Sequence, residues 1–446
     1  METSKRNILS AKLSGLERWV AYAYLVSLPL SLTASWALFI SGLSLRLLLL
    51  CLDKSARVQS WQSFRSAPLA IPLTVFALAV SLSGAFNSEP VYGQLGAGAF
   101  LEAWQSFASL KNLAPYLWAA VVLKPWQGRC RDGIMLLLLV SAVAGIWGSI
   151  QQIFNIHPGY KYLQGTGFLA GPMAFAGQMQ IFSLLSLSFL LNGTYKERSD
   201  DGPSKVAALE GDESAAPAIS ASLNFCGRLF SFLCNRYVFC GVVICNYAGV
   251  LFAGERSAWL GAAAGTLALF WLYWRKLSLK PLLLCLLLAS VCATTVPLVR
   301  TRIQSLFSGN DVSITARQTI WRKCIDLVPQ SPLFGVGIRR FPHFDMPEAI
   351  VPGVSKDLNH AHSNYFHILT TTGLIGFAAF VGLFVAFFVA AWRRWRLARQ
   401  NGDQVAAGIA LGLLAAMVSL SVSGIFEYNF GTAQVRLAQW FLLGLL

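Results

Sequence analysis

The sequence YFHILTTTGLIGFAAFVGLFVAFFVAAW (Tyr365–Trp392) contains no Lys, Arg, Asp or Glu and is followed at once by RRWRLAR. An uncharged apolar run of this length can cross the ~30 Å hydrocarbon layer of a bilayer as a helix. The basic residues behind it mark the point where such a helix meets water. This segment therefore predicts a membrane-spanning helix.

The rest of the chain has the same character. Of its 446 residues 55% are hydrophobic and only 12% are charged, which is more apolar surface than one soluble core can bury. The net charge of +15 would suggest nucleic acid in a soluble protein, but these basic residues mostly lie between apolar runs. Membrane orientation and lipid headgroups explain them better, so we expect membrane lipids and no nucleic acid as partners.

Apolar runs separated by charged or turn residues predict an all-α polytopic membrane protein with about twelve transmembrane helices. The predicted cores are Trp19–Leu30, Leu32–Leu52, Pro68–Phe86, Leu110–Leu123, Ile134–Ile153, Ala170–Leu191, Tyr237–Phe252, Ser257–Trp274, Pro281–Val299, Tyr365–Trp392, Val405–Gly424 and Gln434–Leu446. The first and the last are short for a full span, which indicates partial or tilted helices.

The distribution of Lys and Arg predicts the orientation. With the N-terminus in the cytoplasm, the short outer segments hold only Lys111, Lys161 and Arg256, and the inner segments hold many more basic residues. This satisfies the positive-inside rule and predicts that both termini are cytoplasmic. No small-residue cleavage site follows the first apolar run, so we expect no cleaved signal peptide.

Two polar segments divide the predicted spans. Residues 192–236 contain the low-complexity stretch DDGPSKVAALEGDESAAPA and are expected to form a flexible cytoplasmic linker after the N-terminal half, residues 1–191. Residues 237–299 would form the central spans and residues 300–362 a long, partly helical periplasmic loop, followed by the C-terminal spans within 363–446. The many basic residues of this loop would either meet lipid phosphates or hold an anionic ligand.

Histidines gather at the end of this loop. Four of the five lie there: His343, His360, His362 and His367. Histidine titrates near neutral pH, so His360 or His362 could act as a general base at the membrane surface. The alternative is that they only hydrogen-bond the backbone at a helix start, which we favour for His367. Ser363 or Asn364 would cap that helix, and Gly373 and Gly376 would permit close packing.

Arginines are the second group of candidate residues. Arg256, in AGERSAWLG, precedes a predicted span, and Arg317 lies in SITARQTIWRKC, a helical-looking part of the long loop. An arginine at bilayer depth usually faces the protein interior and has a partner, and Glu255 is the nearest one in the sequence. The planar guanidinium matches phosphate oxygens two at a time, so converging arginines suit a diphosphate. For Arg256 the alternative is a structural pair with Glu255 or a side chain that snorkels to the membrane surface, and for Arg317 it is a solvated helix face.

A metal site is a weaker interpretation of the same histidines. His360 and His362, with His343 and Asp345 or Asp357, could supply zinc ligands, but no second ligand pair has a diagnostic spacing. The nine cysteines form no CxxC motif, and we expect neither a zinc site nor a structural disulfide from them. We therefore predict no metal and no other cofactor.

These segments resemble the bacterial O-antigen ligase family. The family signature of His, a small residue, nine further residues and Gly-x-x-Gly is matched by His362, Ser363, Gly373 and Gly376. The family's Arg…Trp…Pro-Leu-x-Gly-x-Gly…Phe stretch is matched by Arg317, Trp321, Pro332, Gly335, Gly337 and Phe341. GERSAWLG resembles its Arg-bearing turn before a central span. The resemblance covers about residues 250 to 380.

The resemblance implies a metal-independent, inverting glycosyltransferase of the bacterial inner membrane with a periplasmic active site. Its donor would be a glycan on undecaprenyl diphosphate, and its acceptor the lipid A–core oligosaccharide. His362 corresponds to the essential histidine and would be the general base. Arg256 and Arg317 correspond to the essential arginines and would bind the donor diphosphate with Arg339 and Arg340. His360, Ser363, Asn364 and Tyr365 would support the site.

Other functions remain open from the sequence. An O-antigen polymerase or a protein oligosaccharyltransferase would share the fold and the donor and would differ in the acceptor. A transporter or flippase would show inverted repeats and ionisable residues near mid-bilayer. We find no repeat, and most predicted spans lack charge at mid-depth, with Arg46, Glu427 and Arg436 as partial exceptions.

Overall fold

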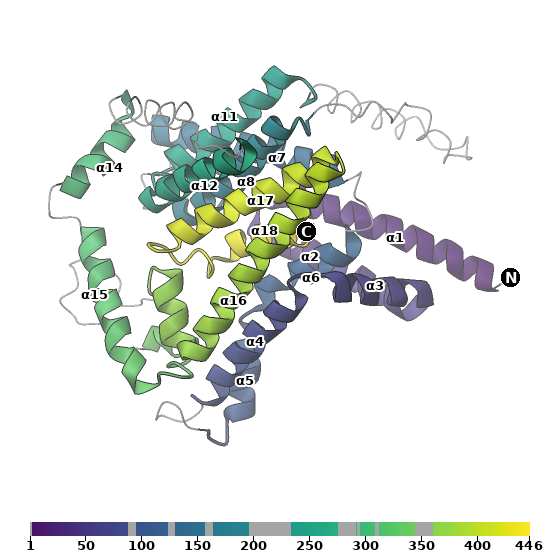
Figure 1. Ribbon diagram of the computed structural model, residues 1–446, viewed down its shortest axis with the longest axis horizontal. Coiled ribbons are helices and arrows are strands. Elements are labelled where there is room, and N and C mark those ends of the chain that lie inside the picture. Colours follow the sequence, from purple (N-terminus) through teal and green to yellow (C-terminus); the bar gives the residue numbers. More distant parts are fainter. Residues whose placement is uncertain are drawn as a thin grey trace.

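The computed structural model describes residues 2–87, 95–123, 130–156, 164–195, 233–274, 291, 295–307, 312–343 and 360–446. Every regular element in these ranges is a helix (Figure 1). The α-helices are α1 (Glu2–Ser27), α2 (Leu32–Leu52), α3 (Lys54–Ser66), α4 (Ala70–Ala85), α5 (Ala99–Ala108), α6 (Pro115–Val122), α7 (Cys130–Phe154), α8 (Pro172–Asn192), α11 (Arg236–Phe252), α12 (Arg256–Trp274), α14 (Pro297–Phe307), α15 (Val312–Leu327), α16 (Asn364–Gln400), α17 (Gln404–Ser423) and α18 (Ala433–Leu443). Short 3₁₀ turns occupy Lys111–Leu113, Val328–Gln330 and Phe341–His343.

Several of these helices have the length and composition of membrane spans. Within the described residues five qualify, or up to six if the bent pair α3 and α4 forms one span. They are α2, α7 from Arg131, α8, α16 and α17. The protein is therefore a helical membrane protein, while the predicted count of about twelve spans stays a prediction. Most of the predicted span Pro281–Val299 and most of the 192–236 linker lie outside the described residues, and the last residues of that span begin α14.

Two predicted spans have a different form in the structure. The sequence Leu110–Leu123 was predicted as one helix, but a 3₁₀ turn at Lys111–Leu113 precedes the short α6, whose first residue is Pro115. A separate helix, α5, precedes that turn and was not predicted. In the first predicted span α1 ends at Ser27, before Pro29, because proline cannot donate the backbone bond that would continue a helix.

The hydrophobic core lies around α8, α12 and α17 at the centre of the molecule (Figure 1). Most of α8 is buried, including polar residues such as Gln180, whose amide oxygen accepts a hydrogen bond from Ser419 of α17. Small residues permit this close packing, since a Cβ on Gly261 of α12 would lie 2.6 Å from the Ser419 carbonyl oxygen. These helices form a tightly packed interior bundle.

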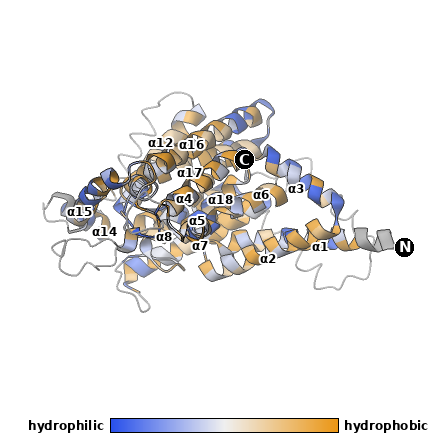
Figure 2. Cartoon of the chain, turned by 90° about the horizontal axis from the view of Figure 1, so that it is seen from below, coloured by the Kyte–Doolittle hydropathy of each residue, from blue (hydrophilic) through white to orange (hydrophobic). Residues whose placement is uncertain are grey.

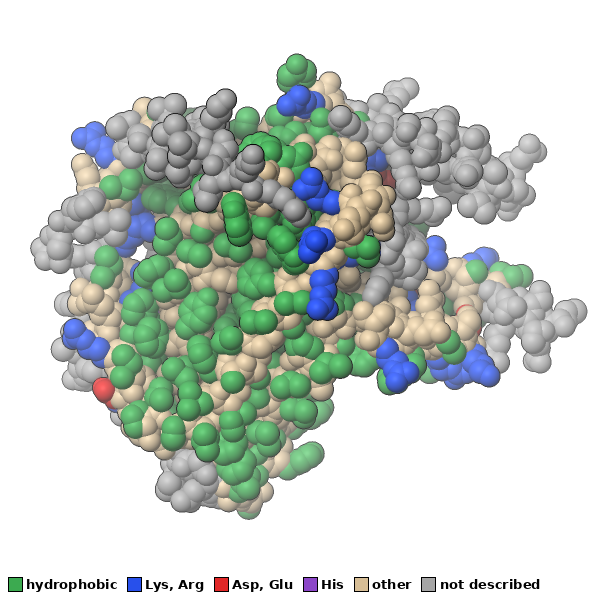
Figure 3. Space-filling model, in the orientation of Figure 1, with side chains coloured by type: hydrophobic (Ala, Val, Ile, Leu, Met, Phe, Trp, Pro, Cys, Tyr) green, Lys and Arg blue, Asp and Glu red, His purple; other side chains and the backbone are tan. Residues whose placement is uncertain are grey.

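The outer surfaces of α4 and α16 are apolar. Ile71 of α4 is 78% exposed and Val385 of α16 is 55% exposed. Hydrophobic side chains dominate the lower part of the face in Figure 3, where α4 and α16 lie in Figure 1. Hydrophilic residues gather instead on α3 and α15 (Figure 2). Exposed apolar side chains over such an area are expected of a surface that faces lipid.

Helix α16 is broken at Gly373, which has φ 64° and ψ −167°. The backbone groups freed by the break bond to the preceding segment, Pro332–Gly337. Val336 N–H donates to the Thr370 carbonyl at 2.9 Å, and Leu374 N–H donates to the Pro332 carbonyl at 2.8 Å. Freed backbone groups at a helix break are satisfied internally in this way because lipid offers them no partner.

The two glycine motifs of the sequence meet at this break. A Cβ on Gly373 would lie 2.4 Å from the backbone of Leu333, and one on Gly335, with φ 68°, would lie 2.5 Å from the backbone of Gly373. Only glycine permits both the positive φ and the close approach. The predicted close packing at Gly373 is therefore a crossing of two backbone segments rather than of two regular helices.

Replacing Gly373 by alanine should destabilise the protein by at least about 1–3 kcal/mol, the cost of placing a side chain in this backbone region. Gly382 of the same helix is the matched control, because a Cβ there would meet nothing within 4 Å. Gly382→Ala should be neutral or stabilising by up to about 1 kcal/mol, the helix-propensity difference. Thermal unfolding of both variants in detergent measures the difference, and equal midpoints would contradict this account of the break.

Candidate active site

The His360–Ser363 turn leads directly into α16. The Ser363 side chain caps the helix by accepting the Phe366 N–H, and His362 has a left-handed backbone with φ 47°. The His362 backbone N–H donates to Nδ1 of His360 at 3.3 Å, and the two imidazole centroids lie 4.3 Å apart. The turn therefore places both imidazoles side by side at the start of α16.

Helix α15 holds this turn from outside. The Trp321 indole N–H donates to the Ala361 carbonyl at 2.9 Å, and its ring stacks on Phe366 with centroids 5.1 Å apart. Phe341 and Ala361 are fully buried in a small hydrophobic cluster beside Trp321. Arg317 lies one turn before Trp321 on the same helix face. The sequence stretch that bears Arg317 thus builds the support for the histidine turn.

The loop between α17 and α18 contributes a carboxylate, Glu427, which is 7% exposed. Its Oε1 accepts the Tyr428 backbone N–H at 3.1 Å. Asn364 fixes the position of this loop, because its Nδ2 donates to Asn429 Oδ1 at 2.7 Å and its Oδ1 accepts the Phe430 N–H. The first residue of α16 therefore ties the histidine turn to the loop that carries Glu427.

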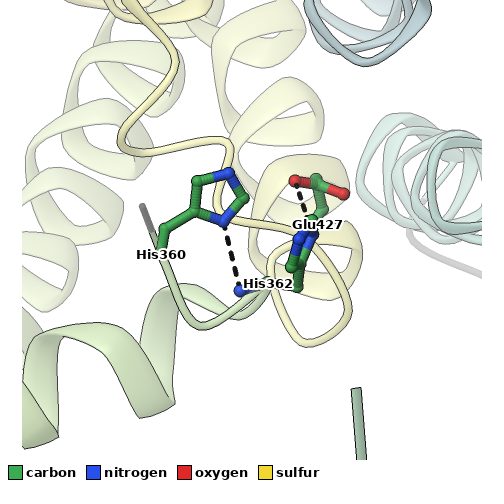
Figure 4. A group of neighbouring side chains, drawn as sticks. All are labelled: His360, His362 and Glu427. Carbon is green, nitrogen blue, oxygen red and sulfur yellow. Dashed lines mark hydrogen bonds and ion pairs between the residues drawn. The ribbon is translucent and has the colours of Figure 1, made fainter. Parts of the chain in front are cut away.

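Glu427 contacts both His362 and Arg317 (Figure 4 shows the histidines). Its Oε1 lies 3.8 Å from His362 Nδ1, and its Oε2 lies 3.7 Å from an Arg317 Nη atom. The atoms His362 Nδ1, Glu427 Oε2 and Arg317 Nε are all buried and have no hydrogen-bond partner. Buried polar atoms are rarely left in this state unless a ligand or water completes them. Three segments distant in the sequence thus meet around polar atoms that have unused hydrogen-bonding capacity.

The electrostatics of this group differ from residue to residue. Burial acts to raise the pKa of Glu427, but the charges of His362, His360 and Arg317 outweigh it and hold that pKa below its usual value. Burial, aided by the positive charges of His362 and Arg317, lowers the pKa of His360 to about 4. At neutral pH this predicts an ionised Glu427 and a neutral His360.

Arg256 is the first residue of α12 and lies beside a second carboxylate, Glu255. Its Nη1 donates to Ser305 Oγ of α14 at 3.1 Å. Burial raises the pKa of Glu255 to about 7, and the negative charge of Glu427 adds to the rise, while Arg302, Arg317 and Arg256 oppose it. These mutual effects place the start of α12 in the electrostatic environment of the His362–Glu427 group.

Other predicted residues have structural partners. Tyr365 donates its hydroxyl to the Ser421 carbonyl at 2.9 Å, and His367 is buried with its ring 4.0 Å from that of Tyr428. Arg339 pairs with Glu102 of α5 at 3.1 Å and contacts Gln105, so it is directed towards α5. The Arg340 backbone N–H donates to the Gly337 carbonyl. The diphosphate-binding roles proposed for Arg339 and Arg340 stay predictions.

The structure places only some of the residues that were named as possible zinc ligands in the sequence. Asp345 and Asp357 lie outside the described residues, as does the side chain of His343. The structure instead brings Glu427 to His360 and His362, and one ligand atom from each of the three lies within 4.8 Å of the others. This group is the part of the site that could hold a metal ion.

Sequence reasoning missed Glu427 as a site residue and recorded it only as a charge that interrupts an apolar run. That interruption was the available signal, because a carboxylate beside an apolar span is costly without a partner. Its partner Arg317 lies more than a hundred residues earlier in the sequence, and its partner His362 lies sixty-five residues earlier. Arg302, whose charge lowers the pKa of Glu255, lies among the many basic residues of the loop, and no motif distinguishes it.

The fold and this group define a helical membrane protein whose charged residues converge at the ends of apolar helices. A family model described as O-antigen ligase matches residues 241–381, which include Arg256, Arg317 and His362. This match supports the resemblance to the O-antigen ligase family over that segment, and members of the family are glycosyltransferase-like enzymes. Glu427 lies beyond the matched segment. No curated protein matches the chain.

Proposed function

We propose that this protein is an O-antigen ligase. It transfers a glycan from undecaprenyl diphosphate to a hydroxyl group of the lipid A–core oligosaccharide, at the periplasmic face of the bacterial inner membrane. The observation that carries the proposal is the meeting of His362, Arg317 and Glu427, of which the first two lie in the segment that matches the O-antigen ligase family. This arrangement offers a base and a cation side by side, which is what transfer from a diphosphate requires.

In the proposed reaction the acceptor hydroxyl oxygen attacks the anomeric carbon of the donor sugar. The bond from that carbon to the diphosphate oxygen breaks, and its electron pair leaves with the undecaprenyl diphosphate. His362 takes the hydroxyl proton. Attack opposite to the leaving group inverts the anomeric configuration, as in inverting glycosidases.

The geometry supports a particular role for each nitrogen of His362. Nδ1 faces the Glu427 carboxylate at 3.8 Å, so Nε2 is the atom placed to accept the proton. Glu427 then stabilises the imidazolium that forms, in the way that a buried carboxylate supports a histidine base. Glu427 is thus a positioning residue, and the neutral His360 beside it does not compete for the proton.

The arginines stabilise the diphosphate leaving group in the proposed reaction. Negative charge develops on the diphosphate as the glycosidic bond breaks, and preorganised cations lower the energy of that state. Arg317 keeps a buried Nε without a partner, and its Nη contact to Glu427 is longer than a hydrogen bond. Its guanidinium therefore has donors available for phosphate oxygens. We assign Arg256 the same role from its place beside Glu255.

The proposal is tested by reconstituting the purified full-length protein with a synthetic undecaprenyl-diphosphate glycan and one acceptor at a time. Lipid A–core should be glycosylated, whereas a second donor molecule or a peptide should not. Transfer to the donor glycan itself would identify a polymerase, and transfer to the peptide an oligosaccharyltransferase. A chelator should not lower the rate, because the proposed base and cations are protein side chains.

A further inference from the structure

Two histidines and one carboxylate from separate segments form a donor set that the proposed transfer reaction does not require as a set. His360 and His362 flank one residue in the turn before α16, and Glu427 comes from the α17–α18 loop (Figure 4). One ligand atom from each lies within 4.8 Å of the other two. Two imidazoles and a carboxylate are a ligand set that zinc uses in proteins where a fourth position stays open.

The distances are close to those of a bound ion. Zinc lies ~2.0–2.2 Å from its nitrogen and oxygen ligands, so ligand atoms around a tetrahedral ion are about 3.4 Å apart. His362 Nδ1 and Glu427 Oε1 are already 3.8 Å apart. The positive φ of His362 brings its ring to 4.3 Å from that of His360. The three ligand atoms, which lie within 4.8 Å of one another, would therefore have to approach by about 1.4 Å at most to reach that spacing.

The surroundings also suit a bound ion. His362 Nδ1 and Glu427 Oε2 are buried atoms without a hydrogen-bond partner, so an ion bound by them would displace no existing hydrogen bond of either atom. Glu427 Oε1 accepts the Tyr428 N–H, a contact of the kind that orients metal-binding carboxylates. The positive charge of Arg317 disfavours the binding of a cation at this place, whereas the Glu255 carboxylate favours it. The site is therefore expected to be weaker than a closed structural zinc site.

We propose that His360, His362 and Glu427 bind one Zn²⁺ ion and that the bound ion inhibits glycan transfer. The inhibition rests on the proposed function, but the binding does not. A neutral imidazole has one basic lone pair, and a metal that takes it leaves the other nitrogen as an N–H donor. Zinc on His362 would therefore remove the base, whichever nitrogen it binds.

Zinc binding is measured by titrating the full-length protein in detergent, after purification through a tag without histidines and alkylation of accessible thiols. His360→Ala and Glu427→Gln each remove one ligand. Glu102→Gln is the matched control, because Glu102 pairs with Arg339 on another surface. Each ligand variant should lose at least about tenfold in zinc affinity, since even outer-shell changes at metal sites cost that much. The control should bind as the native protein does.

Cobalt provides an independent check of the ligand type. Co²⁺ bound by imidazole and carboxylate gives visible d–d bands without the sulfur charge-transfer band that a thiolate ligand adds. The native protein should show these bands, and His360→Ala should lose them. Equal affinities in the native protein and both ligand variants, or a sulfur band that survives in them, would overturn the site. If Glu427→Gln elutes as an aggregate, the His360→Ala comparison still decides.

Inhibition is measured separately, as the zinc concentration that halves each variant's own rate of transfer. His360→Ala should need at least about tenfold more zinc than the native protein, in line with its weaker binding. Activation by zinc, or inhibition at the same concentration in both, would contradict the inhibitory role while leaving the binding result intact. A variant that fails to transfer glycan even when no zinc is added would bear on the proposed function, and not on the zinc site.

Discussion

His362→Ala should reduce the rate of glycan transfer by about 10²–10⁴-fold, the usual contribution of a general base, while the protein still inserts and folds. Its imidazole is the one that faces Glu427, with Nδ1 3.8 Å from the carboxylate Oε1. The rate is measured with saturating donor in the reconstituted assay, and circular dichroism reports whether the helices are retained.

His360→Ala is the matched control, because it removes a neighbouring imidazole from the same turn. Burial lowers the pKa of His360 to about 4, so its imidazole is mostly neutral from about pH 5 upwards. Since His360 does not change charge between pH 5 and 8, its removal should leave the acid limb of the pH–rate profile where it is. An inactive His360→Ala beside an active His362→Ala would show that the base is assigned to the wrong residue.

Arg317→Ala should lower kcat by about 10²–10³-fold, by analogy with the loss of one preorganised donor to a developing negative charge. Arg317→Lys should recover only part of this, because an ammonium group cannot present the planar pair of donors that phosphate oxygens accept. Single-turnover measurements with a bound donor separate this effect from weaker donor binding. Equal rates for Arg317→Ala and the native enzyme would remove Arg317 from the mechanism.

The same substitution has a second effect, on stability. Without Arg317, Glu427 would lose its arginine partner in a buried place, which costs about 3–5 kcal/mol at most. Adding Glu427→Gln removes the unpaired charge and should return the thermal midpoint towards that of the native protein. The double variant should stay slow in transfer, so the comparison separates a folding defect from a catalytic one.

The sequence predicted the class of the protein better than the number of its spans. The uncharged run at Tyr365–Trp392 is part of α16 in the structure, because composition alone makes such a segment a membrane helix. Short apolar segments are less decisive. The run Leu110–Leu123 breaks into a 3₁₀ turn and α6 around Pro115, and hydropathy averaged over the run does not register that break.

The site was predicted in part, for a similar reason. Arg317, Trp321 and His362 lie in recognisable motifs, and the structure gives those motifs a physical basis in the support of the histidine turn. Glu427 lies in no motif, and it joins the group through long-range contacts fixed by the Asn364–Asn429 hydrogen bond. Contacts of this kind depend on how helices pack, which a single sequence does not specify.

The left-handed backbone at His362 has a consequence for how this site is maintained. The left-handed region typically costs a residue other than glycine about 1–3 kcal/mol, although histidine adopts it more often than most, and His362 has φ 47°. Glycine there would relieve the torsional cost and remove the imidazole at once. Selection for stability alone would favour glycine at this position. A histidine with this backbone torsion therefore indicates that the function of its imidazole outweighs the lost stability.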